Sequence, residues 1–250
     1  MDYFRFPHTP HLAWLGSGVP RDDKVLDGRE VERFLERELV VEEKVDGANL
    51  GISVDDELRL RFQMRGQYLS EPYVGQFSRL ISWASPMKDE LALALSEGLV
   101  LFGEWCAARH SLDYDALPDW FLVFDVYDRV AERFWSTSRR DRFAARVGLS
   151  TVPRIAEGVF RFGELKDDLL QRPSCLRNGV MEGIVLRRED DDWGIDRSKL
   201  VRPEFVQSIE AHWSSKGIEW NRLCCPCPAP ATHPGRTRTF AQHGNLRLNR

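Results

Sequence analysis

The most regular alternation of hydrophobic and polar residues in the chain lies at 48–54. There Leu50, Ile52 and Val54 are separated by small or polar residues, a period of two that predicts a strand with one buried face. Residues 39–44 predict a second strand directly before it. Taken alone, the two segments predict a hairpin closed by the Asp-Gly pair that separates them.

Other apolar runs extend this pattern into a chain in which strands dominate. Further strands are predicted at 57–65, 99–107, 119–128, 179–190 and 197–202. Helical periodicity and capping residues predict helices at 29–38, at 73–98 with a break near Pro86, at 136–149 and at 208–223. The helices follow no strict βαβ rhythm, which favours an α+β fold with antiparallel or mixed sheets over a doubly wound fold.

The two ends of the chain lack this regularity. Residues 1–28 are predicted to be irregular, and they contain no positive segment followed by an apolar block, so no secretory signal is expected. No apolar run is long enough to span a bilayer, so no membrane partner is expected. Residues 224–250 are rich in proline, small and polar residues, which predicts a poorly ordered tail after a folded region at 1–223.

Cysteine usage and charge narrow the class of protein. Five cysteines is an odd number, and three of them crowd near the C-terminus, which does not resemble a disulfide framework and predicts a reduced, cytoplasmic protein. The net charge is −4, but residues 224–250 carry four arginines and no acid. Residues 1–223 therefore hold 31 basic and 39 acidic residues. Overall charge gives no support for a nucleic-acid partner, although it is compatible with a local basic groove.

Some nucleotide-binding and hydrolytic motifs are absent. No glycine-rich Walker pattern precedes a lysine, and no Gly-x-Gly-x-x-Gly follows a predicted strand, which argues against P-loop and Rossmann proteins. No serine or cysteine lies in a nucleophile elbow. What remains is a set of charged residues inside or at the ends of apolar strands, which must be paired, exposed or used. Several in one chain predict a shared polar pocket lined by both signs of charge. They are Lys44, Arg65, Glu104, Glu182, Arg197 and Lys199.

The order of the motifs that carry these charges resembles a known family. The segments EKVDG, RGQ, FGEW, FLVFDVYD, MEGIVLR and RSKLVRPEF follow one another in this order. Together they resemble the covalent nucleotidyltransferases, which comprise polynucleotide ligases and mRNA-capping enzymes, and they are most similar to the nick-sealing branch of the ATP-dependent RNA ligases. KVDGAN matches the Lys-x-Asp-Gly motif with the asparagine found in that branch. The resemblance covers roughly residues 5–223.

The resemblance implies both a fold and a reaction. The fold is an α+β nucleotidyltransferase (ATP-grasp-like) domain of two mainly antiparallel sheets with flanking helices and a nucleotide pocket between them. In the reaction a lysine attacks the α-phosphate of ATP with Mg²⁺ or Mn²⁺. The AMP then passes to a 5′-phosphate RNA end, and a 3′-OH end expels it. The implied catalytic residues are Lys44, Glu182, Lys199 and Arg197.

The resemblance also assigns binding roles. Glu104 would hold the ribose hydroxyls, Phe124 would stack on the adenine, and Glu182 would organise the metal ion through water. Arg197 and Lys199 would bind the α-phosphate. The implied nucleotide-binding set is Glu43, Lys44, Val45, Asn49, Arg65, Glu104, Phe124, Glu182, Arg197 and Lys199. The implied contacts to RNA ends are Asp46, Gly47, Asn49 and Arg65.

A nucleophilic lysine needs physical support from its surroundings. Its amine attacks only when neutral, and its ordinary pKa is about 10.4. We expect burial and the cations Arg197 and Lys199 to lower the pKa of Lys44. Simpler alternatives stay open: Lys44 as a solvated strand-end charge, Asp46 as a turn former, and Phe124 as a core residue. In that last case Phe121 or Val123 would face the ligand, and Glu104 and Glu182 could likewise be structural ion pairs.

The chain departs from the family in two places. The last motif is usually Lys-x-Lys, but here it begins with Arg197, which keeps the charge in a different shape. About 50 residues follow it, too few for an OB domain or a large RNA-binding appendage. RNA engagement is therefore expected from the core, from the basic tail, or from an end-healing or RNA-binding partner protein. Zinc binding by the cysteines and histidines of the tail is not favoured.

Three other functions remain as alternatives. A minimal ATP-dependent DNA ligase would carry the same motifs, and a capping guanylyltransferase would differ in using GTP. A non-catalytic module that binds RNA ends would keep the pocket but would not need a nucleophilic amine at Lys44.

Overall fold

The computed structural model describes residues 3–17, 24–207 and 217–224. The predicted tail at 225–250, the cysteines and histidines in it, and residues 208–216 lie outside the described residues. In chain order the elements are α1 (Gly28–Leu35), β1 (Leu39–Lys44), β2 (Ala48–Val54), β3 (Leu60–Gln63), α2 (Leu80–Ala84), α3 (Lys88–Leu95), β4 (Leu99–Trp105), β5 (Phe121–Asp128), β6 (Arg133–Phe134), α4 (Thr137–Arg146), β7 (Ser150–Thr151), β8 (Arg154–Gly158), α5 (Phe162–Gln171), β9 (Gly183–Glu189), β10 (Gly194–Val201) and α6 (Pro203–Gln207).

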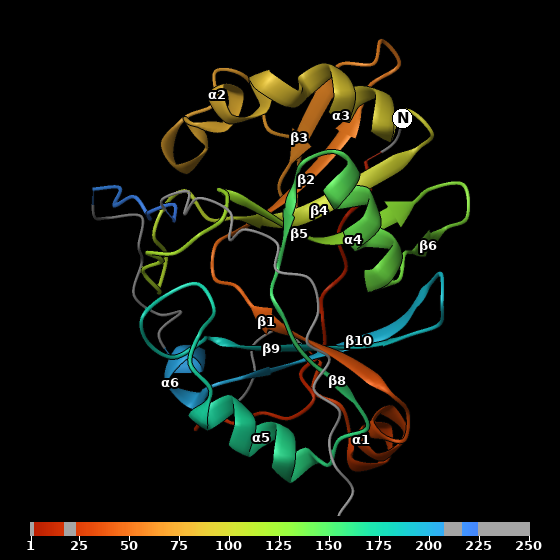
Figure 1. Ribbon diagram of the computed structural model, residues 1–250, viewed down its shortest axis with the longest axis vertical. Helices are drawn as coiled ribbons and strands as arrows, with labels where there is room; N and C mark the ends of the chain where they lie inside the picture. Colours follow the sequence, from red (N-terminus) through yellow and green to blue (C-terminus); the bar gives the residue numbers. More distant parts are fainter. Residues whose placement is uncertain (1–2, 18–23, 208–216, 225–250) are drawn as a thin grey trace, which may run out of the picture.

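Two sheets lie one above the other (Figure 1). The upper sheet has the order β3-β2-β4-β5-β6, with β7 added beside β5, and the lower sheet has the order β10-β9-β1-β8. Every pairing is antiparallel except that of β5 with β7. The predicted α+β class with two mainly antiparallel sheets and flanking helices is therefore confirmed.

The predicted hairpin of 39–44 and 48–54 is wrong, although β1 and β2 have the predicted bounds. β1 pairs with β8 and β9 in the lower sheet, whereas β2 pairs with β3 and β4 in the upper sheet. Residues 45–47 therefore carry the chain from one sheet to the other. Alternation identifies a strand but cannot identify its partner, because register and pairing depend on the rest of the fold.

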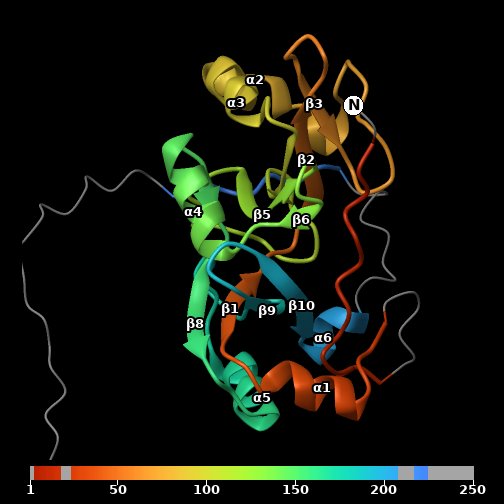
Figure 2. The same cartoon turned by 90° about the vertical axis from the view of Figure 1, so that its right-hand side faces the viewer.

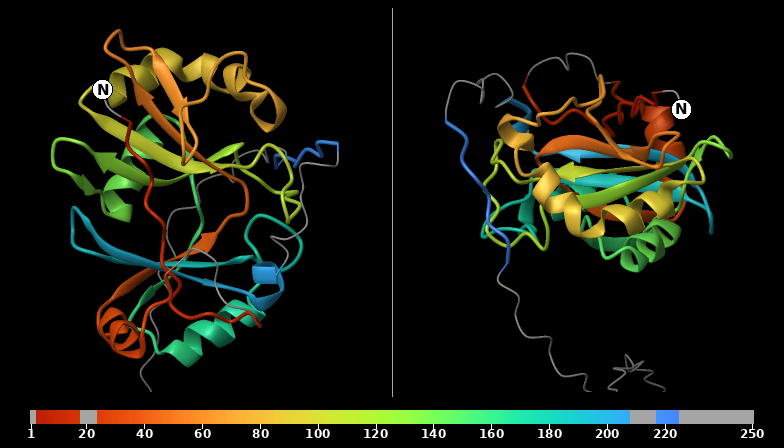
Figure 3. Two further views of the ribbon diagram at one scale, coloured as in Figure 1. Left: turned by 180° about the vertical axis from the view of Figure 1, so that it is seen from behind. Right: turned by 90° about the horizontal axis from the view of Figure 1, so that it is seen from above.

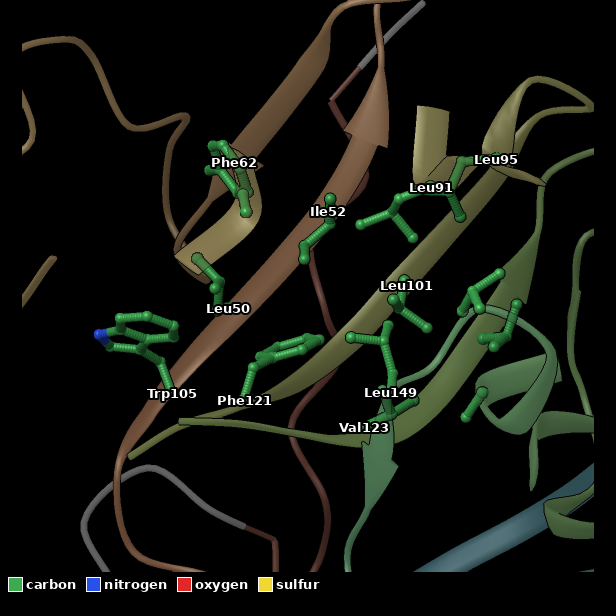
Figure 4. Packing of buried hydrophobic residues seen from close by; sticks show 14 of the residues in the cluster. Leu50, Ile52, Phe62, Leu91, Leu95, Leu101, Trp105, Phe121, Val123 and Leu149 are labelled. Carbon is green, nitrogen blue, oxygen red and sulfur yellow. The ribbon is translucent and has the colours of Figure 1, made fainter. Parts of the chain in front are cut away.

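Helices cover the outer face of each sheet. Figure 4 shows the core above the upper sheet, where Ile52 of β2 and Leu101 of β4 lie near Leu91 and Leu95 of α3, and Leu50 of β2 lies between Phe62 and Trp105. Below the lower sheet, side chains of β1, β9 and β10 pack against α1 and α5; they include Leu39, Val41, Ile184, Leu186, Leu200, Phe34, Leu165 and Leu169. Because successive side chains of a strand point to opposite faces, the other residues of these strands face the space between the sheets.

Residues 3–14 run along one side of both sheets and tie them together (Figures 2 and 3). At the upper end, the Tyr3 hydroxyl donates to the Met64 carbonyl oxygen at 2.7 Å. At the lower end, the Lys199 N–H donates to the Pro10 carbonyl oxygen at 2.9 Å, and the Leu12 N–H donates to the Lys199 carbonyl oxygen at 2.7 Å. This irregular segment therefore forms one wall of the space between the sheets.

Helix ends follow their capping chemistry. α1 begins after Asp27, whose carboxylate accepts the Glu30 N–H at 2.8 Å while Glu30 accepts the Asp27 N–H at 2.9 Å. The predicted break near Pro86 is confirmed, since α2 and α3 are separated by a 3₁₀ turn at Ser85–Met87. None of the helices that the structure describes is long and apolar enough to cross a bilayer.

The described part of the predicted C-terminal helix is not helical. Residues 217–224 run beside the 106–117 loop, and Trp220 and Leu223 form isolated bridges with Ala108 and Leu117. β8 and α5 were not predicted at all.

Candidate active site

A cavity of about 450 Å³ lies between the facing sides of the two sheets. This volume is within the usual range for small-molecule sites. Ten of the twelve predicted site residues line it: Glu43, Lys44, Val45, Gly47, Asn49, Arg65, Glu104, Phe124, Arg197 and Lys199. The two others are Asp46 and Glu182. Residues separated by up to 156 positions in the sequence, Glu43 and Lys199, are thus brought to one place.

Lys44 is the centre of a buried charge cluster. Its position at the end of β1, three residues after Val41 of the lower core, turns its side chain toward the cavity. Its Nζ donates to Oε2 of Glu182 at 2.6 Å, and the two side chains are 26% and 12% exposed. The alternative of a solvated surface charge is therefore wrong, and Glu182 reaches the cavity wall through Lys44.

The pKa of Lys44 is raised, contrary to the expectation from the sequence. Burial by itself lowers this pKa, but the carboxylates of Glu182, Glu104 and Asp46 outweigh burial. Arg197, which was expected to repel the lysine proton, is instead paired with Asp125. In the free protein Lys44 is therefore a protonated amine held by acids.

The buried charges around Lys44 also shift the pKa of Glu104. Burial raises its pKa to about 8, with help from Asp46 and Glu182, while Lys44 partly offsets the shift. Burial also raises the pKa of Glu182. The cluster holds more negative charge than Lys44 balances, which is the condition for taking up a proton or another cation.

The Asp-Gly pair after Lys44 has a structural reason other than a hairpin. A Cβ at Gly47 would lie 2.6 Å from the carbonyl oxygen of Trp105, so only glycine permits this close approach to β4. The Gly47 N–H donates to Oε1 of Glu104 at 3.1 Å. The residue thereby ties the Lys44 strand to Glu104.

Asp46 faces away from the cavity and acts as a turn former. Its Oδ2 accepts the N–H groups of Ser111 and Leu112 at 2.7 and 2.8 Å. Its own N–H donates to the hydroxyl of Tyr114 at 2.8 Å. The predicted contact of Asp46 with an RNA end stays a prediction. Tyr114 itself was missed in the sequence.

Tyr114 is held by the C-terminal segment of the described chain. Its N–H donates to Oδ1 of the buried Asn221 at 2.8 Å, and the amide of Asn221 donates to the Cys106 carbonyl oxygen at 2.8 Å. Residues 217–224 therefore support the turn that follows Lys44. No sequence motif signals this role.

Glu43, like Asp46, has a carboxylate that is hydrogen-bonded outside the cavity. Its oxygens accept the Ser174 hydroxyl and the Cys175 N–H, on the side of β1 away from Lys44. The flank of Glu43 lines the cavity, but its charge does not reach it.

Two polar atoms at the cavity lack hydrogen-bond partners. Oδ1 of Asn49 and Nε of Arg65 are buried and make no hydrogen bond. A buried polar atom without a partner costs about 1–3 kcal/mol, so such atoms commonly have a ligand or water as their partner. Both residues line the cavity, and they are therefore suited to contact a polar ligand there.

Of the three β5 residues that could have faced the ligand, Phe124 is the one that lines the cavity. Phe121 and Val123 are buried in the upper core, whereas Phe124 is partly exposed to the cavity. The ring of Phe6 from the N-terminal segment packs against it, with centroids 5.2 Å apart and planes at 61°. Phe6 thus supports the ring that the sequence assigned to base stacking.

A network of buried ion pairs, which the sequence did not reveal, lies beside Lys44. Arg187 donates to Oε2 of Glu42 at 2.6 Å and to Oδ1 of Asp125 at 2.8 Å. Arg140 donates to Oε1 of Glu42 at 2.6 Å. Both arginines also donate to the Phe124 carbonyl oxygen at 2.8 Å. We call Glu42, Asp125, Arg140 and Arg187 the Glu42 network.

Part of this network could have been inferred from the alternation of side chains along β1. That period places Glu42 on the same face as Lys44, and Arg187 and Asp125 also interrupt apolar strands. Arg140 belongs to a helix with four arginines, where it is indistinguishable in sequence from a solvated charge.

The comparisons with known proteins agree with this geometry. A family model described as RNA ligase matches residues 37–201. Among solved structures, the chain is similar to a lysine-to-alanine variant of Naegleria gruberi RNA ligase with ATP and manganese, with a TM-score of 0.59, 20% identity, and coverage of 72% of this chain and 54% of that one. The same ligase with pyrophosphate gives a TM-score of 0.58, 19% identity, and coverage of 80% and 62%.

A lysine-to-methionine variant of the same ligase, with AMP and manganese, gives a TM-score of 0.55, 18% identity, and coverage of 82% and 64%. The chain thus spans about half to two-thirds of the length of the ligases it matches. No curated protein sequence matches the chain.

Proposed function

The chain belongs to the RNA ligase family, and from this premise we propose that it is an ATP-dependent RNA ligase. It joins 5′-phosphate and 3′-OH RNA ends through a lysyl-AMP intermediate and an adenylylated RNA. One observation carries the proposal: Lys44 lies in a cavity between two sheets, 2.6 Å from a buried carboxylate and beside unpartnered polar atoms of Asn49 and Arg65.

ATP is proposed as the nucleotide because the similar Naegleria gruberi structures hold ATP or AMP with manganese. In this chain, Phe124 would stack on the adenine, and the unpartnered Asn49 and Arg65 atoms would bind polar groups of the nucleotide or of the RNA end. Glu104 would accept hydrogen bonds from the ribose hydroxyls. Arg197 and Lys199, which line the same cavity, would face the α-phosphate.

The donor set fits a hard divalent cation held largely through water. Among the described residues, no group of three or more histidines, cysteines, aspartates or glutamates could hold a metal ion. Mg²⁺ typically uses one or two carboxylates together with waters and phosphates, and Glu182 with Glu104 supplies that number. When bound, the ion would neutralise phosphate charge and assist the departure of pyrophosphate.

The lysine of this site has to lose a proton before it can react. Glu182, hydrogen-bonded to Nζ and with a raised pKa, is placed to hold that proton. The neutral amine of Lys44 then forms an N–P bond to the α-phosphorus as the bond to the β-phosphate oxygen breaks and pyrophosphate leaves. Glu182 and Glu104, which both raise the pKa of Lys44, are also the proposed metal ligands, so a bound cation and the lysine proton compete for the same negative charge.

Transfer of AMP to the RNA end and sealing reuse the same charges. Each step moves a phosphoryl centre, and Arg197 and Lys199 can stabilise the growing negative charge on its oxygens. The RNA itself would be engaged by the core, by the basic tail or by an end-healing or RNA-binding partner. From the cysteine usage we further propose that the protein works in a reducing cytoplasm.

Covalent labelling tests the assignment of the nucleophile. Incubation with ATP labelled at the α-phosphate and Mg²⁺ should attach AMP to the wild-type protein, and mass spectrometry should locate it on Lys44. Lys44→Ala should remove the label while the far-ultraviolet circular dichroism stays unchanged. Lys24→Ala is the matched control, because Lys24 also pairs with a glutamate, at 2.5 Å, but is 63% exposed and outside the cavity. Persistent labelling of Lys44→Ala would refute the proposal.

A further inference from the structure

An edge of the upper sheet next to the cavity carries an unusual mixture of side chains. We call Tyr3, Arg5, Arg61, Arg65 and Tyr68 the Arg–Tyr edge. The guanidinium of Arg61 lies 3.7 Å from the centre of the Tyr68 ring. The Tyr3 ring meets that of Tyr68 edge-on, with centroids 5.2 Å apart. Arg5 is close enough to Tyr3 to influence its pKa, which burial raises and Arg5 partly lowers.

The Arg–Tyr edge is continuous with the cavity. The Tyr3 hydroxyl donates to the Met64 carbonyl oxygen at 2.7 Å, and Met64 and Arg65 both line the cavity. The edge also leads away from it. Asn49 lies at the cavity, and Arg61 pairs in register with Ser53, four residues farther along β2. At about 3.4 Å per residue, Arg61 lies roughly 13 Å beyond Asn49.

The charge of this edge is not balanced. Within the part of the chain that the structure describes, no ion pair joins Arg5, Arg61 or Arg65 to an acidic side chain. Arg59, two residues before Arg61, is paired at 2.9 Å with both Asp55 and Glu57. Although the whole chain has more acids than bases, the three unpaired arginines make this edge locally positive.

Two polar atoms of the edge lack hydrogen-bond partners as well. The hydroxyl of Tyr68 and Nε of Arg65 are buried and have no hydrogen-bond partner. The edge therefore offers cations, hydrogen-bonding atoms and aromatic rings, the combination with which proteins hold a nucleic-acid backbone and its bases. An RNA strand that left the cavity along β3 would pass Arg61.

We propose that the Arg–Tyr edge binds the RNA strand that continues from the end being sealed. Arg5 and Arg61 contact backbone phosphates, and Tyr68 contributes its hydroxyl and ring to the sugar or base. This inference rests on the proposed function and deepens it by giving the RNA a path out of the cavity. It concerns binding only, and no bond is made or broken at the edge.

The test separates the RNA-independent step from the RNA-dependent ones. Arg5→Ala/Arg61→Ala should label with AMP from ATP and Mg²⁺ as wild type does, because that step needs no RNA. Its transfer of AMP to a 5′-phosphorylated RNA oligonucleotide, and its sealing of a nicked duplex, should fall at least tenfold. Arg59→Ala is the matched control in the same hairpin, since its charge is already paired, and it should behave as wild type.

RNA affinity provides a second and independent measurement. The slope of log Kobs against log salt concentration for a 5′-phosphorylated single strand should become shallower by about 1.4 for the double variant, or about 0.7 per lost phosphate contact. An unchanged slope with normal sealing would overturn the proposal. Loss of labelling itself, with a raised KM for ATP, would also overturn it and assign the edge to the triphosphate.

The two proposals fail in different ways. If the wild-type protein showed no labelling on Lys44, the proposed function would fail, but the salt slope of the double variant would still decide whether the edge binds RNA. Thermal unfolding of each variant, compared with wild type, confirms that the fold is intact before either measurement is interpreted.

Discussion

Two polar clusters meet at the inner face of β1, two residues apart, and they differ in how their charges balance. In the Glu42 network, two carboxylates face two arginines. Burial opposes the charged forms, but the partners prevail: the pKa of Glu42 is lowered, and those of Arg140 and Arg187 are raised.

The second cluster is the one around Lys44, in which three carboxylates surround one lysine. Burial and mutual repulsion raise the pKa of Glu104 to about 8, and burial raises that of Glu182. The two carboxylates and two arginines of the Glu42 network therefore balance, whereas in the Lys44 cluster the carboxylates outnumber Lys44, and Lys199 also acts on Glu182. This difference fits a structural role for the Glu42 network and the proposed chemical role of the Lys44 cluster.

The positions of the two clusters agree with this distinction. The Glu42 network joins β1 and β9 of the lower sheet to β5 of the upper sheet and to α4. It fixes the distance between the sheets and so the width of the cavity. The Lys44 cluster lies where the chain crosses between the sheets, and its turn is held by backbone N–H groups that donate to Asp46 and Glu104 and by the hydroxyl of Tyr114.

The largest expected effect comes from opening the Glu42 network. Arg187→Met should lower the free energy of unfolding by about 3–5 kcal/mol, because Asp125 and Glu42 would each lose a buried partner. Lys44→Met should lower it by about 1 kcal/mol or less, since Glu104 and Glu182 can bind protons in place of the lysine charge. Denaturant titration at pH 7 compares the two. Equal losses would show that the two clusters do not differ in this way.

The pH dependence of stability should reveal the uncompensated charge of Glu104. Its pKa is near 4.5 in the unfolded chain and about 8 in the folded protein. Between these values the folded state binds more protons than the unfolded state, so the contribution of Glu104 to stability falls as pH rises from 4.5 toward 8. Glu104→Gln should remove that decline and be more stable than wild type at pH 8, relative to pH 5, by about 3.5 kcal/mol.

Denaturant titrations at pH 5, 6, 7 and 8 measure the effect. Glu57→Gln, at an exposed residue of the β2–β3 hairpin, serves as the control and should follow the wild-type curve. A Glu104→Gln curve parallel to that of wild type would mean that Glu104 is ionised throughout this range.

The sequence predicted strands better than it predicted their partners. β1 and β2 have the bounds that alternation assigned, because both bury apolar side chains at every second position. Their assignment to different sheets could not be predicted, since nothing local distinguishes a hairpin turn from a crossover in which Gly47 passes 2.6 Å from a neighbouring strand. β8 and α5 escaped prediction because β8 is short and only partly buried.

Site residues could be predicted where they belong to a sequence motif. They could not be predicted where their role depends on a contact formed only in the folded chain. Lys44, Glu104 and Glu182, which the motifs single out, lie close together in the structure. The ligand contact that the motifs assign to Asp46 stays a prediction, and Oδ2 of Asp46 accepts the N–H groups of Ser111 and Leu112. Tyr114 could not be found in the same way, because its role depends on one hydroxyl and on a partner segment more than 100 residues later.

Removing the Tyr114 hydroxyl tests whether the Lys44 cluster depends on neutral hydrogen bonds. Tyr114→Phe leaves the Asp46 N–H without its acceptor, so the turn after Lys44 should lose definition. We expect formation of lysyl-AMP to slow about tenfold with little change in KM for ATP, and stability to fall by about 1 kcal/mol. Rapid-quench labelling measures the rate. Tyr127→Phe is the control, because the Tyr127 hydroxyl makes no hydrogen bond to a residue that the structure describes. Equal rates for both variants would contradict the role of Tyr114.

The smallest effect is expected at Arg197, which contacts both the cavity and the Glu42 network. It lines the cavity, yet it pairs with Asp125 and lies 4.4 and 4.2 Å from the ring centres of Phe6 and Phe134. Arg197→Lys restores the usual Lys-x-Lys motif and keeps the charge, so sealing should stay within about threefold of wild type. Stability should fall by about 0.5–1 kcal/mol as the ring contacts weaken.

Comparing the loss of sealing with the loss of stability shows whether Arg197 belongs to the Glu42 network or to the chemistry of the cavity. Asp125 keeps its 2.8 Å contact with Arg187, so the Glu42 network should survive Arg197→Lys. If the variant were nevertheless as unstable as Arg187→Met, Arg197 would be a structural member of the network, and its assignment to the α-phosphate would be wrong. If Arg197→Ala abolished sealing while unfolding changed no more than in Arg197→Lys, its charge would belong to the chemistry of the cavity.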